Sequence, residues 1–338
     1  MSRIVSALPL LALAACSPAE TEADLGTEVP VSEETFGSST SGLTTANGGS
    51  LNGGSLNGGS LNGGSLNGGS LNGNDLSGFL IHVDYAGAAI NGDSSLDWVR
   101  IEGTQFQAKQ GDVLHTGTAF LGAWFYGTLG DGRRAKLRIA DMRAAEAPNG
   151  DLTEYWVEYR DDDNVWHPLC RDSTGAAVWA YPVKGVYDYR RGVPTGGQHS
   201  DDPDHFTFAC AGGAVQKCIN LGYRPWASRD GVSLAAHHQA CTRLIRADYC
   251  GDGTPHTQNG NRVNLYDKLG IQTDTERWFF EASWDAQGAR CFSPLNRSHA
   301  GIPCYDSRLD LFCGLGLSPE QEEGILLRNE TPTAGLTP

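Results

Sequence analysis

The feature that most constrains the fold of this chain is its set of cysteines. Eight of its nine cysteines fall between residues 170 and 313 of the 338. An even number of half-cystines in an exported chain suits a framework of four disulfides, although eight cysteines allow about a hundred pairings. The alternative is a zinc site, but the chain has no Cys-x2-Cys pair to bind zinc. We therefore predict that the disulfides are formed by Cys170, Cys210, Cys218, Cys241, Cys250, Cys291, Cys304 and Cys313.

The N-terminus indicates export and lipid attachment. Arg3 precedes an apolar run, residues 4–13, that is too short to span a bilayer, as in secretory signal peptides. The segment Leu13-Ala14-Ala15-Cys16 resembles the lipobox of bacterial lipoproteins, in which the cysteine is acylated and the preceding peptide is removed. The resemblance implies a signal peptide over 1–15 and lipidation of Cys16. An ordinary signal peptide followed by a chance cysteine is the alternative.

The expected location and partners follow from this anchor. Ser17 stands where enterobacterial lipoproteins of the inner membrane carry aspartate, so the resemblance implies the outer membrane of a bacterial cell envelope, with surface exposure left open. Later segments are too short or too polar to cross a membrane, and we expect the lipid to be the membrane contact. The net charge of −15 argues against nucleic acid or anionic lipid as a partner, since both bind basic surfaces.

Residues 16–76 are predicted to form a lipidated tether. The part up to 46 is rich in Ser, Thr, Glu and Ala and lacks periodic apolar residues, which is typical of disorder. A strict Gly-Gly-Ser-Leu-Asn repeat follows from Gly48 to Asn72. Its period of five resembles pentapeptide-repeat proteins, whose repeats wind into a β-helix. The repeats here would make fewer than two turns, and their glycines raise the entropy cost of ordering. A disordered repeat linker is therefore favoured over a short β-helical stalk.

Residues 77–195 are predicted to form a β-rich, sandwich-like module. Short runs of β-branched and aromatic residues alternate with turn residues, which is typical of antiparallel sheets. Gly130-Asp131-Gly132 and Asn149-Gly150 are favourable hairpin turns. The runs lie at 79–83, 98–101, 123–126, 135–139, 155–159 and 176–180.

Residues 196–330 are predicted to form a disulfide-stapled α+β module, which makes the whole chain α+β. The strongest helix signal covers 233–249, and we expect Gly251 to end that helix. Further predicted elements are a helix at 214–221, strands at 262–266 and 277–284, and a terminal helix at 320–328.

One acid on the 233–249 helix is the main candidate for chemistry. On a helical wheel Asp248 lies on the apolar face with His237 and Cys241, opposite Arg243 and Arg246. A buried carboxylate needs a partner, because leaving it unpaired costs several kcal/mol. The structural interpretation gives Asp248 backbone N–H donors from the 251–253 turn or a distant arginine. The catalytic interpretation makes Asp248 an acid that works with His256 or His237; contact with a ligand or metal is a third possibility.

A family resemblance centres on the same segment. Ala247-Asp248-Tyr249-Cys250, within 243–253, resembles the motif that names the ADYC domain. That family consists of exported bacterial proteins, typically myxobacterial, of uncharacterised function. The similarity continues through 206–210, 222–226, 255–257 and 281–284, and so covers approximately 151–313. It implies a domain and carries no catalytic residues with it.

No cofactor or metal site is predicted. The acidic clusters Asp161-Asp162-Asp163-Asn164 and Asp201-Asp202-Pro203-Asp204 could ligate calcium, but neither has EF-hand spacing, and acid-rich turns are commonly just solvated. The chain also lacks a Gly-x-Ser-x-Gly elbow, a phosphate loop and a His-Glu-x-x-His pair.

The sequence favours a lipid-anchored envelope protein that acts as a surface binding or structural module for an unknown extracellular or envelope ligand. The alternative is a secreted-type hydrolase that uses Asp248 and His256. The two hypotheses predict different geometry. A hydrolase needs a pocket where Asp248, His256 and His237 converge, whereas a binding module needs Asp248 satisfied by backbone amides beneath a filled surface.

Overall fold

The computed structural model describes residues 80–172, 175–257, 261–298, 301–311, 313 and 323–332. The predicted signal peptide, the predicted lipidation site Cys16 and the repeat tether up to residue 76 lie outside these residues. Within the described ranges, none of the helices has both the length and the apolar character needed to cross a bilayer.

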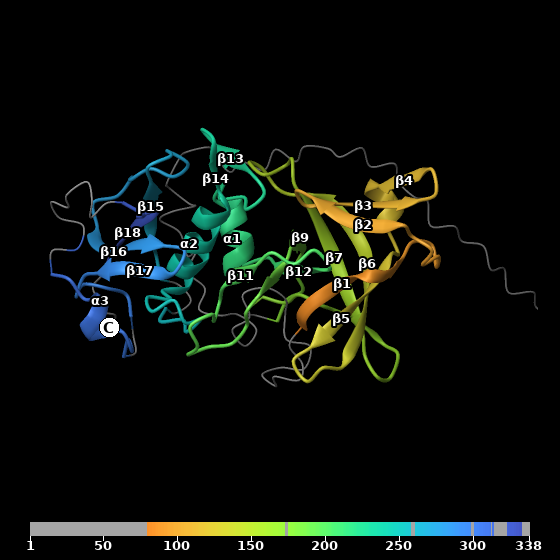
Figure 1. Cartoon of the computed structure of the whole chain (residues 1–338), viewed down its shortest axis with the longest axis horizontal. Coiled ribbons are helices and arrows are strands. Elements are labelled where there is room, and N and C mark those ends of the chain that lie inside the picture. Colours follow the sequence, from red (N-terminus) through yellow and green to blue (C-terminus); the bar gives the residue numbers. More distant parts are fainter. Residues whose placement is uncertain are drawn as a thin grey trace, which may run out of the picture. The chain divides into compact units, whose positions relative to one another are not determined.

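Six antiparallel strands close into a barrel (Figure 1). In order around the barrel they are β6 (Arg134–Ala144), β5 (Trp124–Leu129), β1 (Leu80–Ala89), β12 (His205–Cys210), β9 (Ala180–Lys184) and β7 (Thr153–Arg160). A long β6–β7 pairing completes the ring, and β8 (Trp166–Pro168) adds to β7. The β-rich prediction is correct, but one sheet closes on itself where we predicted a sandwich. Closure pairs strand edges that an open sheet would leave exposed.

Aromatic side chains fill the core of the barrel. Phe125 of β5 and Phe206 and Phe208 of β12 point inward and are almost fully buried. Their rings surround Phe106, which belongs to a separate three-stranded sheet. That sheet consists of β2 (Trp98–Glu102), β3 (Gln105–Gln110) and β4 (Val113–Thr116), and the short helix η3 (Gly117–Phe120) follows it. Offset and edge-to-face ring contacts of this kind add to the stability from burial.

A second core lies between two helices and a four-stranded sheet. Trp284, Tyr249 and Phe292 are fully buried in it. Its main elements are α1 (Ala214–Asn220), α2 (Ala235–Arg246), β15 (Asn264–Asp267), β18 (Leu327–Thr331), β16 (Phe279–Asp285) and β17 (Gly288–Phe292). The shorter elements are β10 (Val186–Tyr187), β11 (His199–Ser200), β13 (Ser228–Arg229), β14 (Val232–Ser233) and α3 (Tyr305–Arg308).

Strands β9 and β12 contribute to both cores. Successive residues of a strand point to opposite faces of a sheet. Ala180 and Phe208 accordingly belong to the barrel core, while their neighbours Tyr181 and Ala209 belong to the second core. The outer face of these two barrel strands is therefore the surface that the second core packs against.

The predicted four disulfides are confirmed. Their Cα–Cα distances of 5.4 to 5.8 Å fall in the usual range for a disulfide. Cys218–Cys241 joins the two main helices, and Cys170–Cys210 joins the end of β12 to the segment after β8. The remaining bridges are Cys250–Cys304 and Cys291–Cys313.

Two helix predictions differ from the structure. The helix predicted over 233–249 is α2, which ends at Arg246. The C-terminal part of the helix predicted over 320–328 is wrong, because residues 327–331 form strand β18. Leu327, Asn329 and Thr331 alternate toward the interior, and β18 pairs with both β15 and β16. These long-range pairings override a local helix preference.

Two of the disulfides allow a matched test of how burial contributes to stability. Cys218–Cys241 and Cys291–Cys313 close loops of nearly equal length, with sequence separations of 23 and 22. Replacing either pair with alanines should cost about 3 kcal/mol through the entropy of the unfolded chain. Removing Cys218–Cys241 should cost more, because both of its sulfurs are fully buried. Urea denaturation measures both values, and equal losses would contradict a contribution from burial.

Candidate functional site

Asp248 lies just beyond the end of α2 rather than on it. Ala247 is the C-terminal cap of α2, with φ 52° and ψ 41°, and its N–H donates to the carbonyls of Arg243 and Leu244. This left-handed residue reverses the chain direction, so the helical wheel no longer applies to Asp248. Asp248 is fully buried. The predicted separation of Asp248 from Arg243 is therefore wrong.

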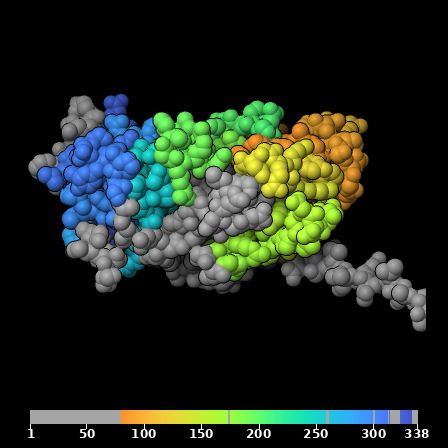
Figure 2. Space-filling view, turned by 90° about the horizontal axis from the view of Figure 1, so that it is seen from below, coloured from red at the N-terminus to blue at the C-terminus, as the bar shows by residue number. Residues whose placement is uncertain are grey.

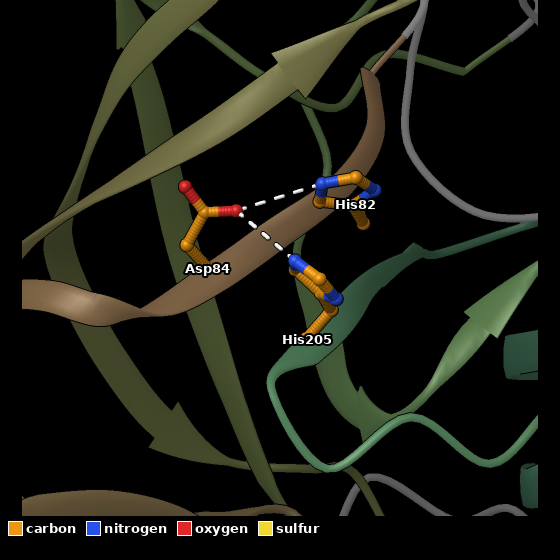
Figure 3. Close-up of side chains that lie close together, drawn as sticks. All are labelled: His82, Asp84 and His205. Carbon is orange, nitrogen blue, oxygen red and sulfur yellow. Dashed lines mark ion pairs between the residues drawn. The ribbon is translucent and has the colours of Figure 1, made fainter.

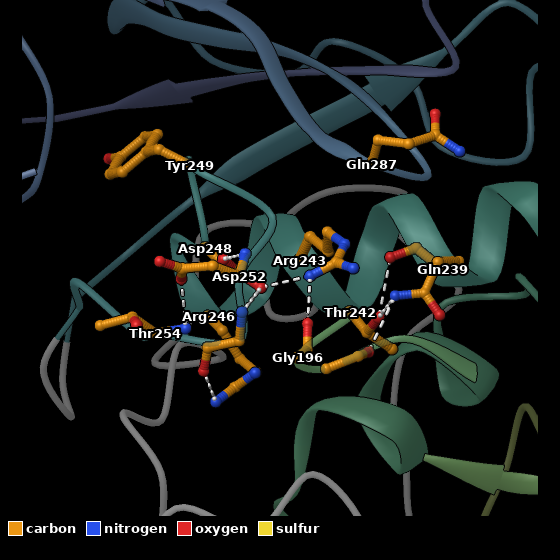
Figure 4. A network of polar contacts seen from close by, with 12 residues as sticks. Gly196, Gln239, Thr242, Arg243, Arg246, Asp248, Tyr249, Asp252, Thr254 and Gln287 are labelled. Carbon is orange, nitrogen blue, oxygen red and sulfur yellow. Dashed lines mark hydrogen bonds and ion pairs between the residues drawn. The ribbon is translucent and has the colours of Figure 1, made fainter. Parts of the chain in front are cut away.

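The carboxylate of Asp248 has donors on both oxygens (Figure 4). Oδ2 accepts hydrogen bonds from a guanidinium N–H of Arg243 at 2.5 Å and from the backbone N–H of Gly253 at 3.0 Å. Oδ1 accepts the backbone N–H of Asp252 at 3.1 Å. These are the turn amides that the structural interpretation names. The arginine comes from the last turn of α2 instead of from a distant segment.

The two arginines of α2 are buried, although we predicted them on the outer side of the helix. Arg243 and Arg246 are 3% and 4% exposed. Arg243 also donates to the carbonyls of Gly196 and Ala286, and Arg246 donates to the carbonyl of Gly253. Burial lowers the pKa of Arg246 to about 10. Loops from distant parts of the chain cover this side of α2, which a helical wheel cannot reveal.

Glycines allow those loops to approach closely. A Cβ on Gly196 would lie 2.0 Å from the carbonyl oxygen of Asp252, and one on Gly251 would lie 1.7 Å from that of Gln287. Gly253 has a φ of +85°, and a Cβ there would meet the carbonyl oxygen of Arg190. Any side chain at these three positions would push apart the loops that satisfy Arg243 and Asp248.

Tyr249 and Cys250 complete the same turn. The hydroxyl of Tyr249 donates to Oε1 of Glu281 at 2.8 Å, and Glu281 also forms a fully buried ion pair with Arg297. Burial raises the pKa of Tyr249 well above its usual value. Cys250 forms its disulfide with Cys304. Each residue from 247 to 250 therefore has a structural contact of its own.

The candidate histidines do not join Asp248. His256 and His237 are both 5% exposed, and burial lowers the pKa of each below its usual value. Among the described residues, neither ring nitrogen of His256 has a hydrogen-bond partner. The ring of His237 stacks on Tyr223, with ring centres 6.4 Å apart. Within the described chain, no hydrogen bond joins Asp248 to His237 or to His256.

A cavity of about 240 Å³ opens beside α2, but it does not contain these candidates. Its lining includes Gln239, Arg243 and Gln287, and excludes Asp248, His237 and His256. Two of the polar side chains at its wall, those of Gln239 and Arg243, already form hydrogen bonds. Gln239 accepts the backbone N–H of His199 and donates to the carbonyl of Gly197. The hydrolase hypothesis requires Asp248, His237 and His256 to converge, and they do not converge at this cavity.

A cluster that the sequence analysis missed lies on the outer surface of the barrel (Figure 3). His82 and Asp84 flank the inward-pointing Val83 on β1, and His205 stands directly opposite Asp84 on β12. Nε2 of His82 and Nε2 of His205 lie 3.5 and 3.6 Å from the same oxygen, Oδ1 of Asp84. All three side chains are half-buried, and their potential ligand atoms lie within 4.8 Å of one another.

Two charged residues hold this cluster. Arg134 contacts the other oxygen of Asp84, Oδ2, at 2.5 Å. Oδ2 of Asp202 lies 2.8 Å from Nδ1 of His205, and this contact lowers the pKa of Asp202. Burial and the neighbouring His205 lower the pKa of His82. The sequence pattern His-x-Asp at 82–84 places two potential metal ligands on one face of a strand. Their proximity to His205, however, depends on the β1–β12 pairing.

The acidic clusters considered for calcium have other contacts. Asp161 accepts the backbone N–H of Val165 and lies 2.7 Å from Nε2 of His167. Asp202 accepts the backbone N–H of Asp204 in addition to contacting His205. Within the described ranges, neither acidic cluster brings three potential metal-binding groups together.

The outer side of β5–β8 forms a surface that we term the cation–aromatic face. Figure 2 shows parts of the β5–β8 segment at the surface, in yellow to yellow-green. Lys136 lies 3.7 Å from the ring centre of Trp124, and Arg138 lies 4.3 Å from that of Trp166. The face comprises the side chains of Trp124, Tyr126, Arg134, Lys136, Arg138, Glu158, Arg160 and Trp166.

The cations of this face differ in their partners. Arg134 pairs with Asp84, and Arg138 pairs with Glu158 at 2.6 Å. Lys136 and Arg160 stand directly opposite each other on β6 and β7, and no carboxylate of the described chain lies within ion-pair distance of either. Like charges in directly opposite positions destabilise a sheet. Repulsion between Lys136 and Arg160 therefore lowers the stability of the barrel at this point.

A family model for the ADYC domain matches residues 117–298, which is more than half of the chain. The match contains the 247–250 segment and the residues that surround it. No curated protein and no solved structure matches the chain.

The structural role of Asp248 can be tested against a matched surface pair. Asp248–Arg243 and Asp151–Arg224 are both 2.5 Å ion pairs, but the first is fully buried and Asp151 is 59% exposed. Asp248→Asn should lower the free energy of unfolding by about 3–5 kcal/mol, since it leaves Arg243 buried without a counter-charge. Asp151→Asn should cost about 1 kcal/mol or less. Denaturant unfolding of both variants checks this, and similar losses would contradict it.

Proposed function

The chain belongs to the ADYC domain family, and from its N-terminal sequence and its disulfides we propose that it is an exported, lipid-anchored binding protein of the bacterial cell envelope. Residues 1–15 serve as the signal peptide, Cys16 carries the lipid, and the repeats up to residue 76 act as a tether. The four disulfides support export, because such bridges form and persist in oxidising compartments. The outer membrane is the proposed site of anchoring, in keeping with Ser17 after Cys16.

A binding role is favoured over hydrolysis by what Asp248 contacts. A general acid or base must reach a substrate proton or a partner histidine. Asp248 is fully buried, and both of its carboxylate oxygens instead accept hydrogen bonds, from Arg243 and from the backbone amides of residues 252–253. The geometry of the described residues therefore gives no specific support to a hydrolase that uses Asp248 and His256.

The observation that carries the binding proposal is the unpaired Lys136–Arg160 juxtaposition. Two opposed cross-strand residues have Cβ atoms about 5 Å apart, close enough for both cations to contact one carboxylate or phosphate. Each cation lies over a tryptophan ring, Lys136 over Trp124 and Arg160 over Trp166, but these rings carry no counter-charge. An anionic ligand would supply that counter-charge and relieve the remaining repulsion. Retaining a destabilising pair in this way is typical of binding sites.

The chemistry of the surrounding face favours an acidic polysaccharide. Partly exposed rings of Trp124, Tyr126 and Trp166 border the two cations. A cation covers one face of each ring, and the rest of the exposed ring surface is apolar area that a sugar ring could contact. The net charge of −15 opposes binding to nucleic acid or to an anionic membrane, where many cations must act together. A polysaccharide with isolated carboxylates needs fewer cations.

Polysaccharide binding can be measured on the full chain with polygalacturonate as an acidic probe and dextran as a neutral one. We expect saturable binding to polygalacturonate that weakens with salt. The double variant Lys136→Gln/Arg160→Gln should lose at least tenfold in affinity. Its unfolding free energy should change by less than about 1 kcal/mol, because removing the repulsion offsets the loss of the contacts with Trp124 and Trp166. Arg100→Gln is the matched control, since Arg100 stacks on Trp98 outside the face.

The polysaccharide proposal fails if the double variant binds polygalacturonate as tightly as the wild type does. It also fails if dextran binds equally well, or if vesicles of anionic lipid bind at this face and polygalacturonate does not. Unfolding measurements on all variants separate a loss of binding from a loss of folding.

Lipid attachment is a separate prediction. Intact-protein mass spectrometry of the chain expressed in a bacterium should show removal of residues 1–15 and an acylated Cys16. Cys16→Ser should abolish acylation and release the protein from membranes, whereas Ser17→Ala should keep it acylated. An unacylated N-terminus in the wild type would contradict the anchor.

A further inference from the structure

We propose that His82, Asp84 and His205 form a binding site for a divalent transition-metal ion of the zinc type. The site lies on the outer surface of β1 and β12 (Figure 3), and it does not depend on the proposed function in polysaccharide binding. It would be a three-ligand site with two imidazole nitrogens and one carboxylate oxygen.

The barrel topology brings the three side chains together. Val83 and Phe206 are fully buried and opposite each other in the register, so their neighbours point outward. His82 and Asp84 therefore share the outer face of β1, and His205 faces Asp84 from the first position of β12. The β1–β5 pairing has register irregularities on either side of residues 82–84, and such irregularities re-aim side chains.

The distances suit a shared ion better than direct hydrogen bonds. Both Nε2 atoms lie 3.5 to 3.6 Å from Oδ1 of Asp84, beyond the usual range for a hydrogen bond. Zinc binds nitrogen and oxygen ligands at about 2.1 Å in a tetrahedron, which puts two ligand atoms about 3.4 Å apart. Both nitrogen–oxygen distances are therefore close to the spacing of two zinc ligands, and all three ligand atoms lie within 4.8 Å of one another.

The charges around the cluster favour a cation. Asp202 lies 2.8 Å from Nδ1 of His205 and so favours the proton on that nitrogen, which leaves a lone pair on Nε2. That lone pair faces Oδ1 of Asp84, another acceptor. A carboxylate behind a ligating histidine is the usual arrangement at metal sites.

Arg134 opposes this effect only in part. Its side chain is 56% exposed, so solvent and salt screen its charge, and it occupies Oδ2 of Asp84 while Oδ1 stays available. With neutral histidines, Asp84 and Asp202 together outweigh Arg134 by one negative charge. Asp202, which we considered as a calcium ligand from sequence, would act here as a positioning residue behind His205.

The ligand set indicates which ions would bind. Imidazole nitrogen suits zinc, copper and nickel, whereas calcium and magnesium require oxygen ligands in larger number. Three protein ligands leave a coordination position for water or for a donor atom from a bound molecule. The half-buried setting of the cluster leaves such a position accessible.

The test titrates Zn²⁺ into the full chain after chelator treatment, without a polyhistidine tag and with Cys16→Ser so that no thiol of that residue competes. Calorimetry should show one equivalent of Zn²⁺ bound, and Co²⁺ should give the visible absorption of a site with low coordination number. His82→Gln and His205→Gln should each weaken binding at least tenfold. Asp202→Asn should weaken binding about tenfold while the stoichiometry stays at one.

His167→Gln is the matched control. His167 lies 2.7 Å from Asp161 in the same barrel, without a third group to complete a site. This variant should bind Zn²⁺ as the wild type does, and Zn²⁺ should raise the Tm of both. The thermal readout also identifies variants that fail to fold, because each is measured with chelator as well as with metal.

Three results would overturn the proposal. The first is the absence of saturable Zn²⁺ binding at one equivalent. The second is equal binding by His82→Gln, His205→Gln and His167→Gln. The third is displacement of Zn²⁺ by Ca²⁺ at equal concentration, which would indicate an oxygen-ligand site elsewhere.

Discussion

The buried ion pair between Arg243 and Asp248 is the contact on which the second core depends. One guanidinium joins the end of α2 to the 248–253 turn, to the loop at Gly196 and to the loop at Ala286. Two charges removed from water are stable only when further hydrogen bonds satisfy them, and here the backbone of three loops supplies those bonds. The pair therefore constrains the positions of segments that are far apart in sequence. Glycines at the contact points make that arrangement sterically possible.

This network gives the sequence signature of the family a physical meaning. Ala247 adopts the left-handed conformation that ends α2, and Asp248 receives the arginine. Tyr249 reaches the buried Glu281, and Cys250 forms a disulfide with Cys304. These four consecutive residues thus end α2, satisfy an arginine of its last turn, and connect the helix end to Glu281 and to Cys304. The contacts that these four residues make within the described chain are structural ones.

The sequence predicted features that depend on local pattern. The disulfide count, the β-rich first module and the hairpins at Gly130 and Asn149 are found in the structure. Features set by distant pairing were missed. Barrel closure requires β1 to pair with β12, more than a hundred residues away, and the His82–Asp84–His205 cluster depends on the same pairing. The predicted position of Asp248 was wrong for a local reason, because the left-handed residue Ala247 ends the helix before Asp248.

The net charge of the chain conceals a local asymmetry that connects the two proposed surfaces. Arg134 belongs to both, since it stacks on Tyr126 in the cation–aromatic face and contacts Asp84 of the histidine cluster. Asp84 neutralises Arg134, just as Glu158 neutralises Arg138, so the positive charge of the face resides in Lys136 and Arg160. A protein with a net charge of −15 can therefore offer a small cationic site, because charge acts over about a Debye length rather than over the whole molecule. A cation at Oδ1 of Asp84 would share that carboxylate with Arg134, which contacts Oδ2, and would leave less of its negative charge to neutralise Arg134. Arg134 is thus the residue through which occupancy of one surface would alter the electrostatic field at the other.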